Sequence, residues 1–498
     1  MSDNSYASIL KSTSLVGGAQ VIKIIFNIAR SKVLAVLIGP SGIGLISAFN
    51  STIELIQKII GLGIGFSAVR EIAHADATKN EYQISESIKT TLYISIILGI
   101  IGTIMAFLLR KPLSRFTFGN DQYALQIGIL SIIIFLNIVS GSQAALIQGK
   151  RRIKDLAKLA VFGAIYGTIF SIPLVYFWGE NGIVPFIIVV ALAQLLTTWW
   201  YSYKISVEKI QISIKKVISK SKNMISLGFS FMAGGFATVL GTYIIRVILI
   251  RKLEIEAVGF YQAAVALSAL YIGIILDAMG KDFYPRLTAV SNDSKKCERL
   301  INEQTEVGIL LAAPGLILTL ALAPFLINIF YSSEFAISYQ ILRWMILGIF
   351  LRVISWPMGF IFIAKGKSMT FFLIQFIFNV AHVILILLLV DHVGIIGTGV
   401  GFSIVYFLHV VFMKLLITRE IQFQWTPRII KLILIVGIVF SCSFLLLLIT
   451  SEILGGIIVC LIGLGLGYFT LRRLMLIMEI QSFTQIIQLF MKRIKKVK

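Results

Sequence analysis

Long apolar stretches, separated by short polar and basic connections, recur along the whole chain. Each is long enough for the roughly 20 residues that an α-helix needs to cross the hydrocarbon core of a membrane. The pattern predicts fourteen membrane-spanning helices, and none of the connections is long enough to form a folded domain. The predicted spans are 10–37, 42–68, 89–109, 122–147, 156–178, 182–203, 224–250, 256–280, 306–330, 337–364, 369–390, 394–417, 429–450 and 453–471.

The composition agrees with a polytopic, all-α membrane protein. Of the 498 residues, 58% are hydrophobic and 14% are charged, whereas a soluble protein carries about 25% charged residues. The three cysteines have no metal-binding or redox spacing. The chain also lacks a Ser-His-Asp order, a paired carboxylate site and a phosphate-cradling loop. We therefore expect neither an enzyme nor a bound cofactor or metal.

Basic residues are strongly biased to one set of alternate connections. These connections hold 32 Lys and Arg residues, and the opposite set holds 5. Because cytoplasmic loops are the ones enriched in Lys and Arg, the bias predicts a cytoplasmic location for both termini. It also accounts for most of the formal net charge of +22, so a nucleic-acid partner is not needed to explain that charge.

Six basic side chains lie inside the predicted spans. A charge near the centre of a bilayer costs about 2.5–3.5 kcal/mol on insertion scales. These side chains must therefore face water, a counter-charge or an anionic cargo, which points to a positively charged transport pathway. The six are Lys23, Arg30, Lys32, Lys58, Arg246 and Arg352.

An internal repeat divides the chain into two halves. Gly44 and Gly65 match Gly259 and Gly280 with a constant offset of 215. Six helices per half keep both halves in the same orientation, which implies a pseudo-two-fold axis along the membrane normal. We expect an N-terminal six-helix bundle (1–203), a basic cytoplasmic linker (204–223), a C-terminal six-helix bundle (224–418), helices 13 and 14 (428–474) and an amphipathic basic cytoplasmic tail (475–498).

Polar residues at helical spacing extend the bases into stripes on the first two spans of each half. Gln20, Lys23, Asn27 and Arg30 share one face of the first span. Allowing one gap, the repeat matches Arg30 with Arg246. Hydrogen bonding between helices remains an alternative role for the neutral polar residues.

Three further residues are candidates for ion coupling, each with an alternative role. Glu54 could instead pair with Lys58, four residues later. Asp277 could pair with Lys281 in the same way. His382 could be a packing residue or part of a proton relay.

Three short runs resemble Wzx-type O-antigen flippases. They are Ile-Gly-Pro-Ser-Gly-Ile-Gly-Leu at 38–45, Val-Gly-Phe-Tyr-Gln-Ala at 258–263 and Asp-Phe-Tyr-Pro-Arg-Leu at 282–287. These flippases form part of the MOP superfamily, with multidrug MATE exporters and MurJ-type lipid II flippases. The resemblance covers the first twelve predicted helices. The first run is weak alone, and the other two are moderately specific.

The resemblance implies a V-shaped pair of six-helix bundles in the bacterial inner membrane. Such a protein would move an undecaprenyl-pyrophosphate-linked oligosaccharide by alternating access, with membrane lipid, a glycan polymerase and chain-length machinery as partners. Fourteen helices depart from the twelve expected of common relatives, although lipid II flippases also have two extra helices. The residues expected to bind the phosphates are Lys23, Arg30, Arg246 and Arg352, and those expected to face the sugars are Gln20, Asn27 and Gln262.

Two other transport functions in the same superfamily are alternatives, namely a lipid II flippase and a cation-coupled multidrug exporter. An exporter of cationic drugs would favour an acidic cavity. Here the six bases within the spans outnumber the acids, which are Glu54 and Asp277. A membrane-embedded glycan polymerase or ligase would need larger outer loops than this chain has.

Overall fold

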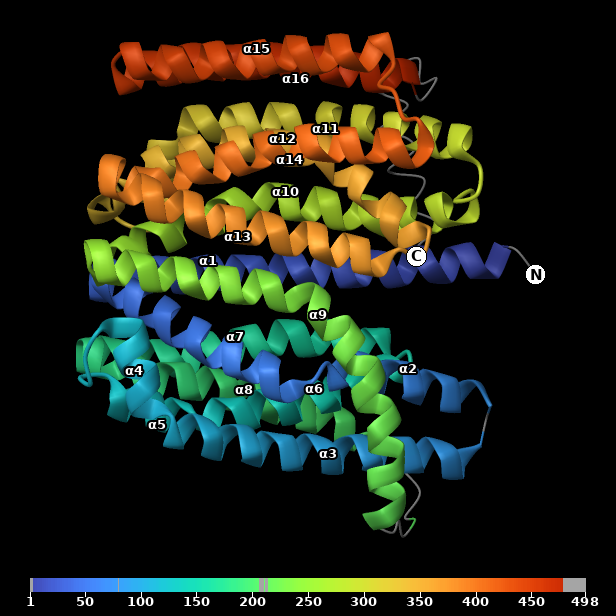
Figure 1. Cartoon of the computed structure of the whole chain (residues 1–498). Coiled ribbons are helices and arrows are strands. Elements are labelled where there is room, and N and C mark those ends of the chain that lie inside the picture. The colour runs from blue at the N-terminus through green and yellow to red at the C-terminus, as the bar shows by residue number, and fades with distance from the viewer. Residues whose placement is uncertain (1–2, 79, 206–209, 211–213, 478–498) are drawn as a thin grey trace. The chain divides into compact units, whose positions relative to one another are not determined.

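A computed structural model describes residues 3–78, 80–205, 210 and 214–477. These residues fold almost entirely as helices (Figure 1). No β-strand occurs in this part of the chain, which confirms the prediction of an all-α fold. Nine stretches of the described residues are long and apolar enough to cross a membrane. The chain is therefore a multi-pass membrane protein. The predicted amphipathic segment at 478–498 lies outside the described residues.

The nine stretches contain eleven of the fourteen predicted spans. This is because Ile153–Tyr203 and Ser368–Ile421 each hold two helices joined by a short 3₁₀ turn. The three other predicted spans, 10–37, 42–68 and 224–250, lie on the two helices that carry five of the six predicted bases. The charged side chains of those two helices therefore need contacts with other parts of the protein rather than with lipid.

The chain divides into two compact units, Met1–Gly259 and Phe260–Lys498. The first unit contains α1 (Asp3–Gly61), α2 (Ile64–Ala77), α3 (Glu81–Leu108), α4 (Arg110–Phe118), α5 (Ala124–Leu130), α6 (Ile132–Gly149), α7 (Ile153–Trp178), η1 (Gly179–Gly182), α8 (Ile183–Tyr203), α9 (Ile214–Leu253) and the first turn of α10 (Ile255–Ala289). The second contains the rest of α10, α11 (Ser294–Phe330), η2 (Ser333–Phe335), α12 (Ser338–Ala364), α13 (Ser368–Val393), η3 (Gly394–Ile396), α14 (Gly397–Ile421), α15 (Pro427–Ile449) and α16 (Glu452–Ile477).

Helix α9 belongs to the first unit, because it packs against α1, α2 and α3. Figure 1 shows α9 changing direction part-way along its length. Its first part crosses α2 and α3, and its second part runs beside α1.

Helix α1 contains a sharp break at Gly39, where φ is 59° and ψ is −165°. This backbone conformation is open essentially to glycine alone. Pro40 follows directly, and proline is favoured in the first turn of a helix. The break falls between the first two predicted spans, so the Gly-Pro pair separates α1 into two helical halves.

The second half of α1 packs closely against α9 and the first turn of α10. At one end, a Cβ on Gly44 would collide with the backbone carbonyl of Ile255, and one on Gly259 with that of Pro40. At the other end, just beyond α1, Gly63 lies equally close to the backbone of Gly228. Glycine permits this approach because it has no side chain. We call residues 40–63 and 228–259 together the α1–α9 interface.

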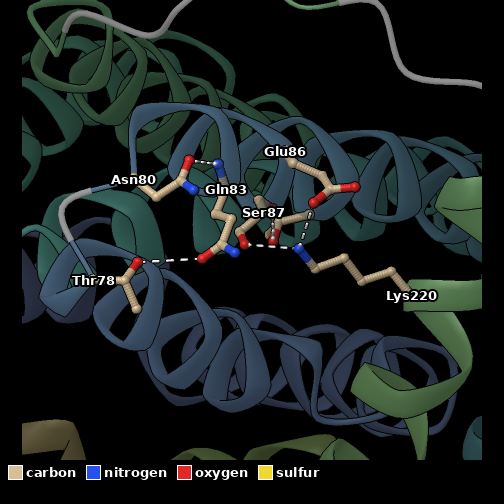
Figure 2. Close-up of polar contacts among 7 residues, drawn as sticks. Thr78, Asn80, Gln83, Glu86, Ser87 and Lys220 are labelled. Carbon is tan, nitrogen blue, oxygen red and sulfur yellow. Dashed lines mark hydrogen bonds and ion pairs between the residues drawn. The ribbon is translucent and has the colours of Figure 1, made fainter.

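A lysine fastens the first part of α9 to α3. Lys220 Nζ lies 3.2 Å from Glu86 Oε2 and 3.1 Å from Ser87 Oγ (Figure 2). Glu86 is only 8% exposed. At the start of α3, the Asn80 side chain accepts a 3.1 Å hydrogen bond from the backbone N–H of Gln83 and caps the helix (Figure 2). The segment between the predicted bundles is thus tied to the first unit.

In the second unit, α15 and α16 are held on α11 by another buried carboxylate. Glu306 Oε1 lies 2.8 Å from Arg473 Nη2 and 3.1 Å from Arg428 Nε. Asn302 of α11 also donates to the carbonyl of Gln424, just before α15. The two last helices are therefore attached to this unit by polar contacts as well as by apolar packing.

The close approach at Gly44 generates a prediction. Gly44→Ala should lower the apparent melting temperature, because the new Cβ would meet backbone, which cannot rotate away. The matched control is Gly61→Ala on the same helix, where a Cβ would meet no atom within 4 Å. Alanine favours a helix over glycine by about 1 kcal/mol, so the control should be neutral or stabilising. Equal melting temperatures for both variants would contradict the packing described.

A second prediction concerns Lys220. Lys220→Met should remove the ion pair of the buried Glu86 and lower the free energy of unfolding by about 1.5–3 kcal/mol, the contribution of hydrogen bonds to charged groups. Arg299→Met is the control, because Arg299 and Glu303 form an exposed pair, and such pairs contribute little. Thermal unfolding of the purified variants in detergent measures both effects. The ion pair would be unimportant if both variants unfolded at the wild-type temperature.

Candidate functional site

Arg246 lies in the α1–α9 interface and is oriented by neutral oxygen atoms. Its Nε donates to Ser47 Oγ of α1 at 2.7 Å, and its Nη1 donates to the backbone carbonyl of Thr242 at 3.2 Å. Ser47 is 6% exposed. These hydrogen bonds help to fix the direction of the guanidinium.

Lys58 lies in the same interface, about three helical turns from Ser47 along α1. A Cβ on Gly235 of α9 would lie 3.8 Å from Lys58 Nζ. The expected alternative, an ion pair between Glu54 and Lys58, is not found among the described contacts, and Glu54 is exposed. The lysine head therefore lies at ordinary contact distance from α9. Sequence reasoning could not find this contact, because Gly235 is remote in the chain.

Arg30 lies before the break in α1 and contacts a different set of helices. Its Nη2 donates to Asn27 Oδ1 at 3.2 Å, and its guanidinium carbon is 6.0 Å from the centre of the Phe186 ring on α8. Gly167 of α7 lies nearby. A guanidinium has five N–H donors, and the described contacts use one, so four remain for another acceptor.

The other polar residues predicted on the first part of α1 are open to their surroundings. Gln20 is exposed and Lys23 is half-buried. Both lie on the face that carries Asn27 and Arg30. Arg30 and Arg246 resemble each other in one respect, since each bonds to an oxygen about one turn earlier on its own helix. No described hydrogen bond joins the two arginines.

In the second unit, Arg352 lies among aromatic rings. Its guanidinium carbon is 5.9 Å from the ring centre of Tyr406, which in turn contacts the ring of His409. His409 is close enough to Arg352 to be affected by its charge. No sequence pattern places His409 at a site, because its partners lie on other turns and helices. His382 packs against Phe402, and its Nε2 is buried without a partner in the described part of the chain.

The two remaining predicted residues lie on α10. Gln262 is half-buried, and Asp277 is exposed. An ion pair between Asp277 and Lys281 was one expectation, but the described residues contain none. Asp282 and Arg286 form the ion pair of this helix instead, at 3.2 Å. Among the described residues, no group of His, Cys, Asp and Glu side chains could hold a metal ion.

Comparison with known proteins identifies the family. Residues 33–340 match the model of a family described as "Polysaccharide biosynthesis protein". The chain belongs to this family. A protein named "Putative O-antigen transporter" from Shigella flexneri is 23% identical over 393 residues, which cover 77% of this chain and 91% of that protein. The predicted resemblance to Wzx-type flippases of the MOP superfamily is therefore confirmed.

Solved structures of other transporters share the fold of this chain. One is an inward-facing multidrug resistance MATE transporter, with a TM-score of 0.70 and 15% identity, covering 80% of this chain and 94% of that chain. Another is the lipid II flippase MurJ, with a TM-score of 0.67 and 17% identity, covering 92% of this chain and 99% of that one.

The bond between Arg246 and Ser47 generates a prediction. Ser47→Ala should reduce transport, because the Arg246 guanidinium loses the group that directs it. Hydrogen bonds to charged groups contribute about 1.5–3 kcal/mol. The control is Ser51→Ala on the same helix, because Ser51 is as buried as Ser47 but donates to the carbonyl of Ala48 on its own helix. Transport assays on equal amounts of inserted protein compare the two. Equal transport by both variants would show that this bond does not matter.

Proposed function

We propose that this protein is a flippase for an undecaprenyl-pyrophosphate-linked oligosaccharide, an O-antigen or related surface glycan unit. It would move this cargo from the cytoplasmic to the outer leaflet by alternating access, as a transporter and not as an enzyme. The family match and the O-antigen transporter relative support transport of a lipid-linked glycan. The basic residues of α1 and α9 indicate that the charged group on the cargo is an anion.

The observation that carries the proposal is the chemistry around Arg30. Its described hydrogen bond ends on the neutral amide oxygen of Asn27, and its guanidinium lies beside the Phe186 ring. A neutral partner holds this guanidinium in place and leaves its positive charge to attract an anion. Arg246, which the repeat matches with Arg30, is proposed as the second contact. Pyrophosphate is the strongly charged part of the proposed cargo, and the planar guanidinium fork suits bidentate contact with phosphate oxygens.

The roles proposed for the other predicted site residues follow from where these residues lie in the structure. Lys23 shares the face of Arg30 and is proposed to add to its field, while Gln20, Asn27 and Gln262 are proposed to bind sugar hydroxyls. Arg352 is proposed as a phosphate contact of the second unit. Glu54, Asp277 and His382 remain candidates for ion coupling.

We further propose fourteen membrane-spanning helices in two six-helix bundles, with α15 and α16 as the extra pair. The division into bundles at 1–203 and 224–418, with both termini in the cytoplasm, follows from the repeat and the charge bias. The match to the lipid II flippase covers 92% of this chain, and the match to the MATE transporter covers 80%. This difference supports two helices in addition to the two bundles. The proposed location is the bacterial inner membrane, where glycan polymerase and chain-length machinery would be partners.

Function can be tested by complementing a strain that lacks its O-antigen flippase and measuring surface glycan. We expect the wild-type protein to restore it, and Arg30→Ala or Arg246→Ala to reduce it about ten- to hundredfold, from the loss of charged hydrogen bonds. The control is Arg286→Ala, because Arg286 is exposed and paired with Asp282. Membrane blots would verify equal insertion.

The outcomes separate the competing functions. Full restoration by both arginine variants would exclude the phosphate contact. Failure of the wild-type protein to restore glycan, together with drug resistance in a pump-deficient strain, would favour a multidrug exporter. Rescue of a strain lacking its lipid II flippase would instead identify lipid II as the cargo.

A further inference from the structure

Three charged side chains in the described part of the chain are at most 9% exposed: Glu86, Glu306 and Arg343. Glu86 is paired with Lys220, and Glu306 with two arginines. Arg343 differs from both. It is 5% exposed, and its Nε and Nη2 are buried without a hydrogen-bond partner. A buried charged group whose donors lack partners is destabilising, so an anion that accepts hydrogen bonds from these nitrogens would stabilise the protein.

The head of Arg343 lies near the start of α12. Its guanidinium carbon is 4.8 Å from the ring centre of Tyr339, one turn earlier, as expected for a helical side chain that points towards the N-terminus. Trp344, the next residue, packs against Phe444 of α15. The guanidinium therefore has the Tyr339 ring beside it, and the residue that follows it in the chain contacts α15. Under the predicted topology, this end of α12 faces the outer leaflet.

The same segment is short of hydrogen-bond acceptors. The hydroxyls of Ser332 and Ser338 are also buried without a partner, so four of the eleven such side-chain atoms in the described part lie within residues 332–343. Arginine nitrogens can only donate, and a serine hydroxyl can donate as well. The missing partner of Arg343 must supply acceptor oxygens and negative charge. A phosphate group meets both requirements.

The surroundings favour a phosphate that belongs to a lipid. Large apolar side chains are exposed around the turn between α15 and α16, where Ile449 is 78% and Ile453 is 79% exposed. These side chains are suited to contact acyl chains. Glu452, the first residue of α16, lies close to both Tyr339 and Arg343. It is exposed, and no ion pair joins it to Arg343 among the described contacts.

We propose that Arg343, beside the Tyr339 ring, binds the phosphate of a lipid headgroup at the end of the second unit predicted to face the outer leaflet, with Glu452 as an adjacent competitor. This site is separate from the residues proposed to contact the cargo on α1 and α9. It does not depend on which glycan is carried.

The test uses the purified full chain in detergent and follows thermal unfolding as each probe is added. The probes are dioctanoyl phosphatidylglycerol, dioctanoylglycerol (which lacks the phosphate) and inorganic phosphate. We expect phosphatidylglycerol to stabilise the wild-type protein and dioctanoylglycerol to have no comparable effect. Stabilisation by inorganic phosphate alone, at similar concentrations, would identify free phosphate as the source.

Two variants distinguish a phosphate site from a simple ion pair with Glu452. In Arg343→Met, half-maximal stabilisation should require about tenfold more lipid, from loss of one charged hydrogen bond. Without lipid this variant should be as stable as wild type or more so, because an apolar side chain replaces an unpaired charge. Glu452→Gln should lower the lipid concentration required, because a competing negative charge is removed.

The opposite results would overturn the proposal. If Glu452→Gln destabilises the protein without lipid and leaves the lipid response unchanged, Arg343 serves as the partner of Glu452. If wild type and Arg343→Met respond equally to phosphatidylglycerol, the lipid binds elsewhere. Glu452 is a surface residue, so its variant keeps the test valid even if Arg343→Met fails to fold.

Discussion

The close packing of α1 against α9 determines where the bases of the first unit lie. Two helix backbones can approach this closely only where neither carries a side chain, as at Gly44 and Gly259. The close approach brings Arg246 within reach of Ser47 and Lys58 beside Gly235. Basic side chains that would be costly against lipid are thereby directed to a neighbouring helix. A cationic site inside a membrane protein thus depends on residues that contribute no chemistry of their own.

In both units, a buried ion pair attaches a later segment of the chain to an earlier helix. In each, a buried glutamate on one helix receives a basic side chain from a later segment of the chain: Glu86 receives Lys220, and Glu306 receives Arg473. The segments held in this way are the start of α9 and the end of α16. The start of α9 follows the six spans predicted for the first half, and the end of α16 follows the last predicted span. The apolar pattern alone does not fix how either segment packs. Apolar side chains gain little by packing on another helix rather than on lipid. The ion pairs therefore specify which helix each segment contacts.

The sequence predicted the helical segments well, because the length and polarity of each span are local properties. It also separated the first two spans between residues 37 and 42, where the break in α1 falls at Gly39. It could not predict contacts that depend on the register between remote helices. For that reason the neighbour of Lys58 and the position of His409 near Arg352 emerged only from the structure.

The break at Gly39 has an electrostatic consequence for α1. A continuous helix has one positive end, where its first N–H groups point. Because the backbone at Gly39 is not helical, the half that begins at Pro40 has a positive end of its own. Ser41, in its first turn, donates a 2.7 Å hydrogen bond to the carboxylate of Glu180 on η1. One glycine therefore gives α1 two helix dipoles, and a negative side chain from another part of the first unit lies at the start of the second.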